Sequence, residues 1–510
     1  MHRTRRSRLL LFGLTVLACT AAAHAKQDAG QWNVVEERWY ALEFGGAKAG
    51  WTSNVISTDG QRFRTDTEMS MKISRGQLPI EIAMSWSFIE TAQGKPVLMQ
   101  SKQTMSRQSM ETEWTFLDDH VDVISRQGGK ETVRQQPLPA GEWLPPAAAD
   151  RFARQQRETN VESFTLRAID PQNGLNPIGV TSTRKGKEQV EVDGKTIDVT
   201  VWSTVTDIMP VEAIEKINSE GTMVLQDTTI PGLGKMSMRL TTKALAKGDA
   251  GGPGPELLLQ TFVTPDKPVE DSMKATRAKL RLTVKDGKMP NLPTAGAQRV
   301  EMGADGKSAV LTIDVNDNSA ASAEDSANKE YLAASAMVDS SDELIQKLAK
   351  RAADRGENGG EAVGDDPMRR AEALRRLARK LISRKGMETA FASASETAKM
   401  RTGDCSEHGV LLCALLRADG IPARVATGLI YADQFAGHEG LFGWHMWTQA
   451  LIDGKWVDFD ATLPTRYNAV HILTATSSLN NGLSAMDMAP VIQLIGNLDV
   501  EVLEVHHGEK

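Results

Sequence analysis

The chain has few of the features that define several large classes of protein. Its 510 residues include three cysteines, and only 5% are aromatic. With so few thiols it cannot rely on a disulfide framework, so its stability must come from a hydrophobic core. The formal net charge is −7, which argues against a nucleic-acid-binding surface and against a polybasic membrane patch. No segment after the N-terminal region is apolar enough to cross a membrane.

Residues 1–25 have the pattern of a cleaved secretion signal. A basic start, HRTRRSR, precedes the apolar run LLLFGLTVLA, and Ala23 and Ala25 supply the small residues of a cleavage site. The sequence therefore predicts an exported protein, periplasmic or secreted, whose mature chain begins at Lys26 and has no transmembrane segment. Lipid attachment at Cys19 and export by a twin-arginine signal are less favoured alternatives.

The length of the chain predicts two to four domains. Over residues 26–160 apolar and polar residues alternate, which is typical of antiparallel strands with one solvated face. A second strand-rich stretch covers residues 161–315 and contains turns at Asp-Gly pairs. Residues 316–330 are polar and rich in Ala and Ser, which predicts a linker. The remaining residues, 331–510, begin with amphipathic helices and form the predicted C-terminal domain.

Cys405 lies in the stretch TGDCSEHGV, where local signals predict the start of a helix. Asp404 and Glu407 have the spacing of a capping box, and Gly420 marks the end of the helix. The thiol would lie in the first turn, where the macrodipole and unpaired amides stabilise a thiolate. Cys413 lies in the apolar run VLLCALL and is interpreted as a core residue. On this spacing alone, Cys405 could equally be a buried inert residue.

A cysteine nucleophile needs a base, and the sequence offers His445. It lies in GWHMWTQALIDGKWVDFDAT, which predicts a hairpin with its turn at Asp453-Gly454. With a two-residue turn, His445 and Asp460 are diagonal neighbours on one face, within side-chain reach, and Asp458 is one step further away. A three-residue turn would move Asp460 to the other face.

A helix-borne thiol with a histidine and a carboxylate on adjacent strands is the arrangement that activates a cysteine nucleophile. His408 is a poorer base because it lies on the helix of the thiol itself. A zinc site formed by Cys405, His408 and His445 is less favoured because it lacks a second cysteine pair. The sequence therefore predicts neither a metal nor a cofactor.

The segment GDCSEHGVLLCALLRADGIPARVATGLIY, followed by WHMWTQALIDGKWVDFDAT, resembles the catalytic core of the transglutaminase-like superfamily. That superfamily includes transglutaminases, bacterial cysteine proteases and peptide N-glycanases on a papain-like core. The likeness is close over residues 391–463 and looser on either side. It implies that Cys405 is the nucleophile, His445 the general base and Asp460 the orienting acid. Gln449 departs from the pattern, because many relatives have Glu there.

The opening WYALEFGGAKAGW resembles the strand-rich modules that precede this core in exported bacterial members. The expected fold class is therefore α+β, with a papain-like transglutaminase core on the C-terminal side and two antiparallel β-rich domains before it. The expected substrate is a protein or peptide, whose carboxamide the thiolate attacks to give a thioester, with hydrolysis favoured. A cross-linking transglutaminase and a non-catalytic exported binding or scaffold protein are the alternatives. No feature selects an oligomeric state.

Overall fold

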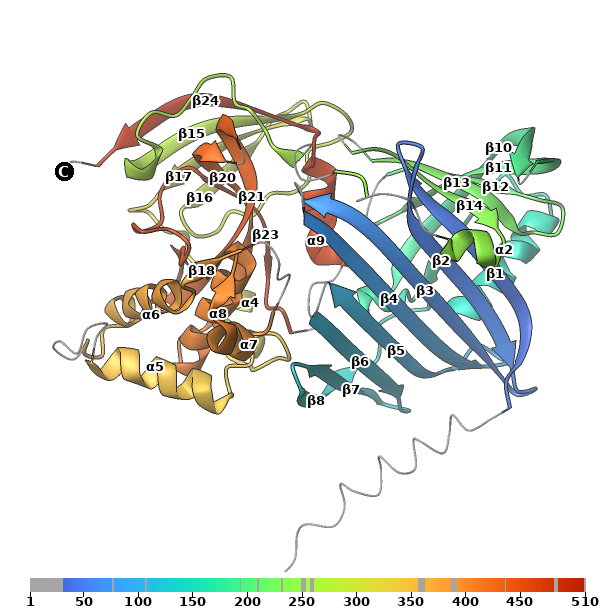
Figure 1. Ribbon diagram of the computed structural model, residues 1–510, viewed down its shortest axis with the longest axis horizontal. Coiled ribbons are helices and arrows are strands. Elements are labelled where there is room, and N and C mark those ends of the chain that lie inside the picture. The colour runs from blue at the N-terminus through green and yellow to red at the C-terminus, as the bar shows by residue number, and fades with distance from the viewer. Residues whose placement is uncertain are drawn as a thin grey trace, which may run out of the picture.

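The computed structural model describes residues 31–508 except 76–77, 106–107, 193, 209–210, 231–232, 249–253, 257–260, 356–362, 387–391, 436 and 481–484. The predicted signal segment, with Cys19 and the predicted cleavage site, lies outside the described residues. Figure 1 shows a large curved sheet on one side of the molecule and helices around a smaller sheet on the other. Among the described residues, no helix has both the length and the apolar character needed to cross a membrane.

The first half of the chain forms mainly strands. These are β1 Asn33–Phe44, β2 Ala47–Thr58, β3 Arg62–Arg75, β4 Leu78–Thr91, β5 Pro96–Met105, β6 Gln108–Phe116, β7 His120–Gln127, β8 Lys130–Pro137, β9 Ser163–Ala168, β10 Ile178–Val192, β11 Lys195–Thr206, β12 Ala213–Ile217, β13 Met223–Ile230 and β14 Gly234–Thr241. Within the described residues they make one 14-stranded sheet in the order β8-β7-β6-β5-β4-β3-β2-β1-β14-β13-β12-β11-β10-β9. Along β7, buried and partly exposed residues alternate, as the period-two pattern predicts.

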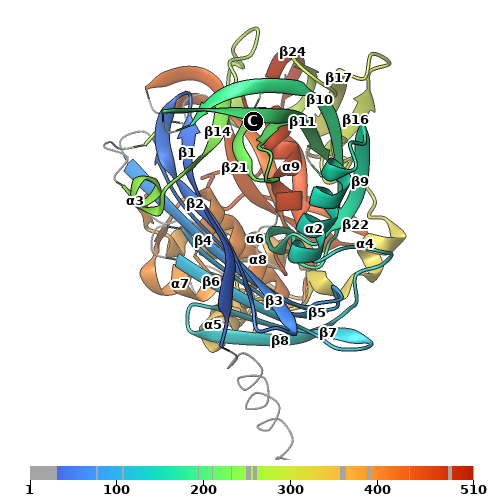
Figure 2. The same cartoon turned by 90° about the vertical axis from the view of Figure 1, so that its right-hand side faces the viewer.

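The large sheet curls strongly, and Figure 2 looks into its hollow side. Helix α2 (Pro146–Glu158) lies in that hollow and is tied to the strands by ion pairs. Arg157 pairs with Glu215 of β12 at 2.9 Å, and Arg151 pairs with the buried Glu90 of β4 at 3.3 Å. The short elements η1 (Pro171–Asn173) and α3 (Lys243–Lys247) complete this part of the chain.

The strands are grouped differently from the predicted stretches 26–160 and 161–315. Strand β1 is hydrogen-bonded to β14, with Tyr40 opposite Leu240, so strands from both stretches share one sheet. The later strands of the second stretch belong to another sheet. Which edges pair depends on hydrogen bonds between distant segments, and periodicity does not encode them. The predicted domain limits therefore remain predictions.

The second sheet contains the C-terminal strand of the described chain. Its members, in the order β16-β17-β15-β24, are β16 Gln298–Met302, β17 Ser308–Asp314, β15 Ala275–Val284 and β24 Leu498–His507. Leu282 of β15 lies opposite Val500 of β24, and both are buried. Apolar residues of this sheet pack against those of the C-terminal sheet, so the two sheets share a core.

The C-terminal part combines helices with a four-stranded antiparallel sheet, so the predicted α+β class with antiparallel sheets is confirmed. Its sheet has the order β22-β21-β20-β23, formed by β20 Ala423–Phe435, β21 His438–Ile452, β22 Lys455–Phe459 and β23 His471–Ser477. The helices are α5 Glu343–Arg355, α6 Pro367–Leu381, α7 Ala394–Met400, α8 Cys405–Ala418 and α9 Ala485–Leu494, with η3 Ser272–Lys274 earlier in the chain. The short strands β18 Arg384–Lys385 and β19 Thr402–Gly403 pair in parallel. Helix α8 packs on β20 and β21, and nearly all of its residues are buried.

The predicted linker at residues 316–330 is structured. It contains α4 (Ala323–Ala327) and leads into η4 (Lys329–Tyr331). Asp325 accepts a hydrogen bond from Trp456 Nε1 at 2.9 Å and pairs with Arg424 at 3.2 Å. Polar composition alone predicted a solvated linker, but its carboxylate is paired with residues more than ninety positions later.

Candidate active site

The N-terminus of α8 is organised by a capping box, as predicted. Asp404 accepts from the backbone N–H groups of Ser406 and Glu407, and Glu407 Oε2 accepts from Asp404 N at 2.9 Å. The N–H of His408 donates to the Asp404 carbonyl. Among the described residues this leaves the N–H of Cys405 as the first-turn donor without an acceptor. The Cys405 thiol is half-buried beside it.

The hairpin of β21 and β22 has the predicted two-residue turn. Ile452 lies opposite Lys455, and Asp453 and Gly454 have φ angles of 50° and 74°. Positive φ at both turn positions is the type I′ geometry, which Asp-Gly favours. The register therefore places the side chains of His445 and Asp460, which directly follows β22, on the same face of the hairpin.

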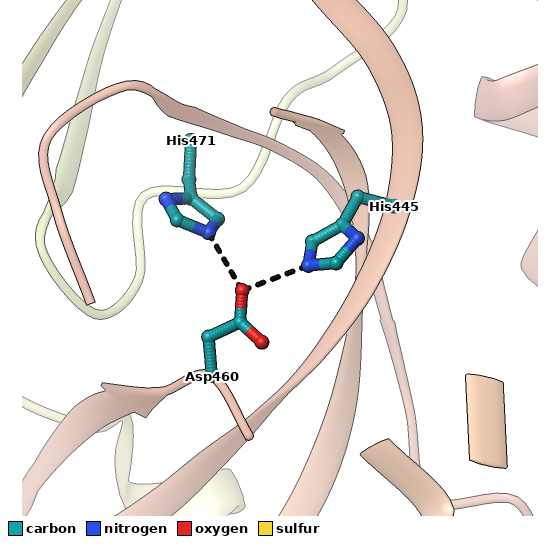
Figure 3. Close-up of side chains that lie close together, drawn as sticks. All are labelled: His445, Asp460 and His471. Carbon is teal, nitrogen blue, oxygen red and sulfur yellow. Dashed lines mark hydrogen bonds and ion pairs between the residues drawn. The ribbon is translucent and has the colours of Figure 1, made fainter. Parts of the chain in front are cut away.

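His445 and Asp460 are in direct contact. Their Nε2 and Oδ2 atoms are 2.8 Å apart, and the Asp460 side chain is fully buried (Figure 3). The other carboxylate oxygen, Oδ1, accepts from Thr462 N at 2.7 Å and from Thr462 Oγ1 at 2.6 Å. Four donors thus surround Asp460 when a second histidine is counted. These contacts favour the ionised carboxylate and fix its orientation.

The second histidine is His471 of β23, which the sequence analysis did not identify. Its Nε2 lies 3.2 Å from Asp460 Oδ2, and its Nδ1 lies 3.0 Å from the carbonyl oxygen of Asn468 (Figure 3). Its ring also stacks on Tyr467, with the ring centroids 4.2 Å apart. The available signal was a lone histidine at the start of the run HILTATS, and such a histidine is more often a core residue with its hydrogen bonds satisfied.

The imidazole of His445 connects the carboxylate to the thiol. It hydrogen-bonds to Cys405, and because Nε2 contacts Asp460, Nδ1 is the nitrogen left for the sulfur. Burial lowers the pKa of His445, but the charge and hydrogen bond of Asp460 and the contact with Cys405 outweigh it and raise the pKa to about 10. The imidazolium form of His445 is therefore favoured at neutral pH. The structure brings all three predicted site residues together.

Asp458 has different partners. Its carboxylate is buried and accepts from Trp447 Nε1, Gln449 Nε2 and the backbone N of Ala297 at 2.8–2.9 Å. Gln449 also accepts from Arg424 Nε at 3.0 Å. An amide can donate to Asp458 and accept from Arg424, whereas a Glu at this position would oppose the Asp458 carboxylate. The departure at Gln449 from the pattern of the relatives therefore matches its hydrogen-bond partners, Asp458 and Arg424.

Two further groups near the thiol have shifted pKa values. Burial, followed by the charge of Asp404, raises the pKa of Glu407 to about 7. Burial lowers the pKa of His408, whose Nδ1 lies 2.6 Å from the Asp404 carbonyl and whose Nε2 is buried without a partner. Both side chains come from the first turn of α8, and both hydrogen-bond to the backbone of Asp404 next to Cys405.

The sequence predicts no metal site, and one cluster of side chains bears on that prediction. The nearest donor atoms of His445, Asp460 and His471 lie within 4.8 Å of one another, a spacing that could hold an ion. Both Nε2 atoms, however, contact the same carboxylate oxygen at 2.8 and 3.2 Å, which is the distance of direct hydrogen bonds. These bonds account for the spacing without a metal, and the absence of a metal remains a prediction.

Residues 361–461 match the family model of the transglutaminase-like superfamily, and the match includes all three predicted site residues. The C-terminal part of the chain is therefore a transglutaminase-like domain, as the motif resemblance predicted. No curated protein matches the chain.

Two solved structures are similar to parts of the chain at low identity. One is a proposed cysteine protease from Cytophaga hutchinsonii, with 17% identity and a TM-score of 0.25, covering 46% of this chain and 85% of that one. The other is a proposed protease from Parabacteroides distasonis, with 10% identity and a TM-score of 0.17, covering 73% of this chain and 68% of that one. At these TM-scores the likeness supports no conclusion about fold or activity.

Proposed function

We propose that the protein is a cysteine-dependent amide hydrolase that acts on protein or peptide carboxamides. Cys405 is its nucleophile, His445 its acid and base, and Asp460 the group that orients His445. The superfamily match supports a cysteine-dependent enzyme. The observation that carries the specific proposal is the continuous contact from the thiol through His445 to the buried Asp460.

In the acylation step the Cys405 thiolate attacks the carbonyl carbon of the substrate amide. The oxygen gains negative charge, and the free N–H of Cys405 at the start of α8 donates to it. As the C–N bond breaks, the His445 imidazolium gives its proton to the departing nitrogen. Ammonia or an amine leaves, and the acyl group remains on sulfur as a thioester.

In the deacylation step His445 is neutral and accepts a proton from an attacking water. The hydroxide adds to the thioester carbonyl, the C–S bond breaks, and the thiolate and imidazolium form again. Asp460 stabilises the imidazolium in both steps without being protonated itself, in the manner of the acid in other triads. Water is preferred to an amine acceptor because it is abundant and because no feature that would exclude it is evident in the part of the chain that the structure describes.

The test uses a peptide that carries a thiol-reactive electrophile in place of its carboxamide. Wild type should form one adduct at Cys405, Cys405→Ala should form none, and His445→Ala should react slowly. Cys413→Ala is the matched control, because this thiol is buried in the middle of α8. Adduct mapping by mass spectrometry would contradict the proposal if Cys405→Ala were labelled as fast as wild type.

We also propose export with removal of residues 1–25. The basic start, the apolar run and the alanines at positions 23 and 25 support this. Intact-mass measurement of protein from the expressing cell should give a chain beginning at Lys26. A chain beginning at a lipid-modified Cys19 would contradict cleavage before Lys26 and would indicate a membrane anchor.

A further inference from the structure

A cavity of about 610 Å³ lies between α6 and the segment that follows Asp460. Five of its lining side chains are cationic: Arg375, Arg376, Arg379, Lys380 and Arg466. Glu372 is the one carboxylate of the lining, and it is held by Arg375 at 2.8 Å and by Arg376 at 2.9 Å. The chain as a whole has a net charge of −7, so this concentration of positive charge is local.

Two of these arginines lack anionic partners. Arg379 has a buried Nε that contacts no acceptor, and Arg466, which is exposed, forms no ion pair among the described residues. A guanidinium without a carboxylate partner keeps its positive charge uncompensated, and arginine pairs well with the oxygens of an anionic ligand. The cavity therefore has uncompensated positive charge for an anion.

The positive surface continues to the nucleophile. Strand β18 contributes Arg384 and Lys385 and pairs with β19, which ends two residues before Cys405. Arg384 donates to the Met400 carbonyl at 3.0 Å, and Lys385 donates to the Thr462 carbonyl at 3.4 Å.

These acceptors are neutral carbonyl oxygens, so neither cation is neutralised by the bond. Thr462 itself lies beside the imidazole, with its Oγ1 3.4 Å from His445 Nε2. Lys385 is therefore connected to His445 through a single residue, Thr462. The row of cations runs from the cavity to the edge of the proposed catalytic centre.

We propose that this basic surface binds acidic segments of the polypeptide substrate and holds the neighbouring carboxamide at Cys405. The surface is defined by Arg376, Arg379, Lys380, Arg384, Lys385 and Arg466. This inference rests on the proposed function, since it names the class of substrate for the same site. A cavity lined mainly by one sign of charge concentrates ligands of opposite sign, and arginine pairs well with carboxylates. Because the cavity is concave, side-chain carboxylates of a peptide can enter it, whereas a flat membrane surface cannot.

The test measures binding to full-length Cys405→Ala protein, which cannot turn over the probe. A fluorescein-labelled peptide of ten glutamates is compared with a Gly-Ser-Gln peptide of equal length by fluorescence anisotropy. The glutamate peptide should bind more tightly, and its affinity should fall with added salt. Adding Arg379→Gln and Arg466→Gln should weaken binding about tenfold or more, because two unscreened cations of the site are lost.

The matched control replaces Lys195 and Lys307 by Gln, which removes the same charge from exposed positions outside the basic surface. It should bind as the parent does. Equal binding of the glutamate peptide by both double variants would overturn the proposal, as would equal binding of the neutral peptide. Vesicles of anionic phospholipid bound in an Arg379- and Arg466-dependent manner, with no binding of the glutamate peptide, would assign the surface to a membrane and overturn it too.

Alkylation of Cys405 by iodoacetamide separates this inference from the proposed function. A reactive Cys405 in a protein that does not prefer the glutamate peptide would refute the basic surface alone. An inert Cys405 in a protein that binds the glutamate peptide through Arg379 and Arg466 would refute the nucleophile alone.

Discussion

Asp460 and Asp458 are two residues apart and both are buried, yet they have different hydrogen-bond partners. Asp460 contacts the two histidines, and Asp458 contacts an indole, an amide and a backbone N–H. Asp460→Asn should keep the fold but favour the wrong His445 tautomer, lowering turnover by about 10²- to 10⁴-fold. Steady-state kinetics on any substrate, or the rate of thiol labelling, measures this loss.

Asp458→Asn is the control for that experiment. Its amide would direct N–H groups at donors, so the variant should lose stability while keeping most of its activity per folded molecule. If Asp460→Asn kept its turnover and Asp458→Asn lost it, Asp458 would be the acid of the site.

His471 contacts the same oxygen of Asp460 as His445 does, which makes it a positioning residue. His471→Gln should lower kcat with little change in KM, because the ring touches the carboxylate and not the substrate. The loss should be smaller than that of Asp460→Asn. Thr474→Val on the same strand is a matched control that removes a buried hydrogen bond, to the Thr427 carbonyl, away from the carboxylate. A kcat loss of equal size in both variants would show that His471 acts only through stability.

Glu407 makes stability depend on pH. Because burial raises its pKa from about 4.5 to about 7, the folded chain holds a proton that the unfolded chain releases. Its contribution should therefore decline as pH rises from about 4.5 to about 7 and stay level above that, by on the order of 1–3 kcal/mol. In Glu407→Gln the free energy of unfolding, measured in urea at several pH values, should lose this decline. If the free energy of unfolding had the same pH dependence in both proteins, the pKa of Glu407 would not be raised by folding.

At the scale of elements, α8 places its two thiols in opposite environments. Cys405 lies in the capped first turn beside His445, whereas Cys413 is fully buried and burial raises its pKa. Iodoacetamide at pH 6 should therefore modify Cys405 far faster than Cys413 in the folded protein. Peptide mapping after timed quenching gives both rates, and the unfolded protein is the reference in which they should converge. Equal protection in the folded state would argue against an activated nucleophile.

The elements that local signals define were predicted well. The bounds of α8 follow from its capping box and from Gly420, and the β21–β22 register follows from Asp453-Gly454. Helix α4 was missed because its segment has a linker composition, and its carboxylate is paired only through the tertiary fold. Local chemistry thus predicted where elements start and turn, but not what a polar surface segment packs against.

At the scale of the whole molecule, Lys130 joins the large sheet to the C-terminal part of the chain. It lies at the start of β8 and pairs with Asp339 at 2.7 Å and with Asp342 next to α5. Lys130→Gln leaves the buried Asp339 without its cation, and should lower the free energy of unfolding by about 1–3 kcal/mol. Lys95→Gln is the control, because its pair with Asp118 is exposed on the same sheet and should contribute little. Urea unfolding of the two variants compares them, and equal losses would mean that the contact between the two parts is not stabilising.

The sequence by itself determined the helix that carries Cys405, the hairpin that carries His445, the two-residue turn that brings Asp460 within reach of His445, and the resemblance to the superfamily. Each of these depends on residues close together in the chain, where capping, turn geometry and alternation act. Only the tertiary structure decided that His471 shares Asp460, that β1 pairs with β14, and that α6 and the segment after Asp460 enclose a cationic cavity. These arrangements join segments that are distant in sequence, and what brings them together is the burial of apolar faces and the need of buried polar groups for partners.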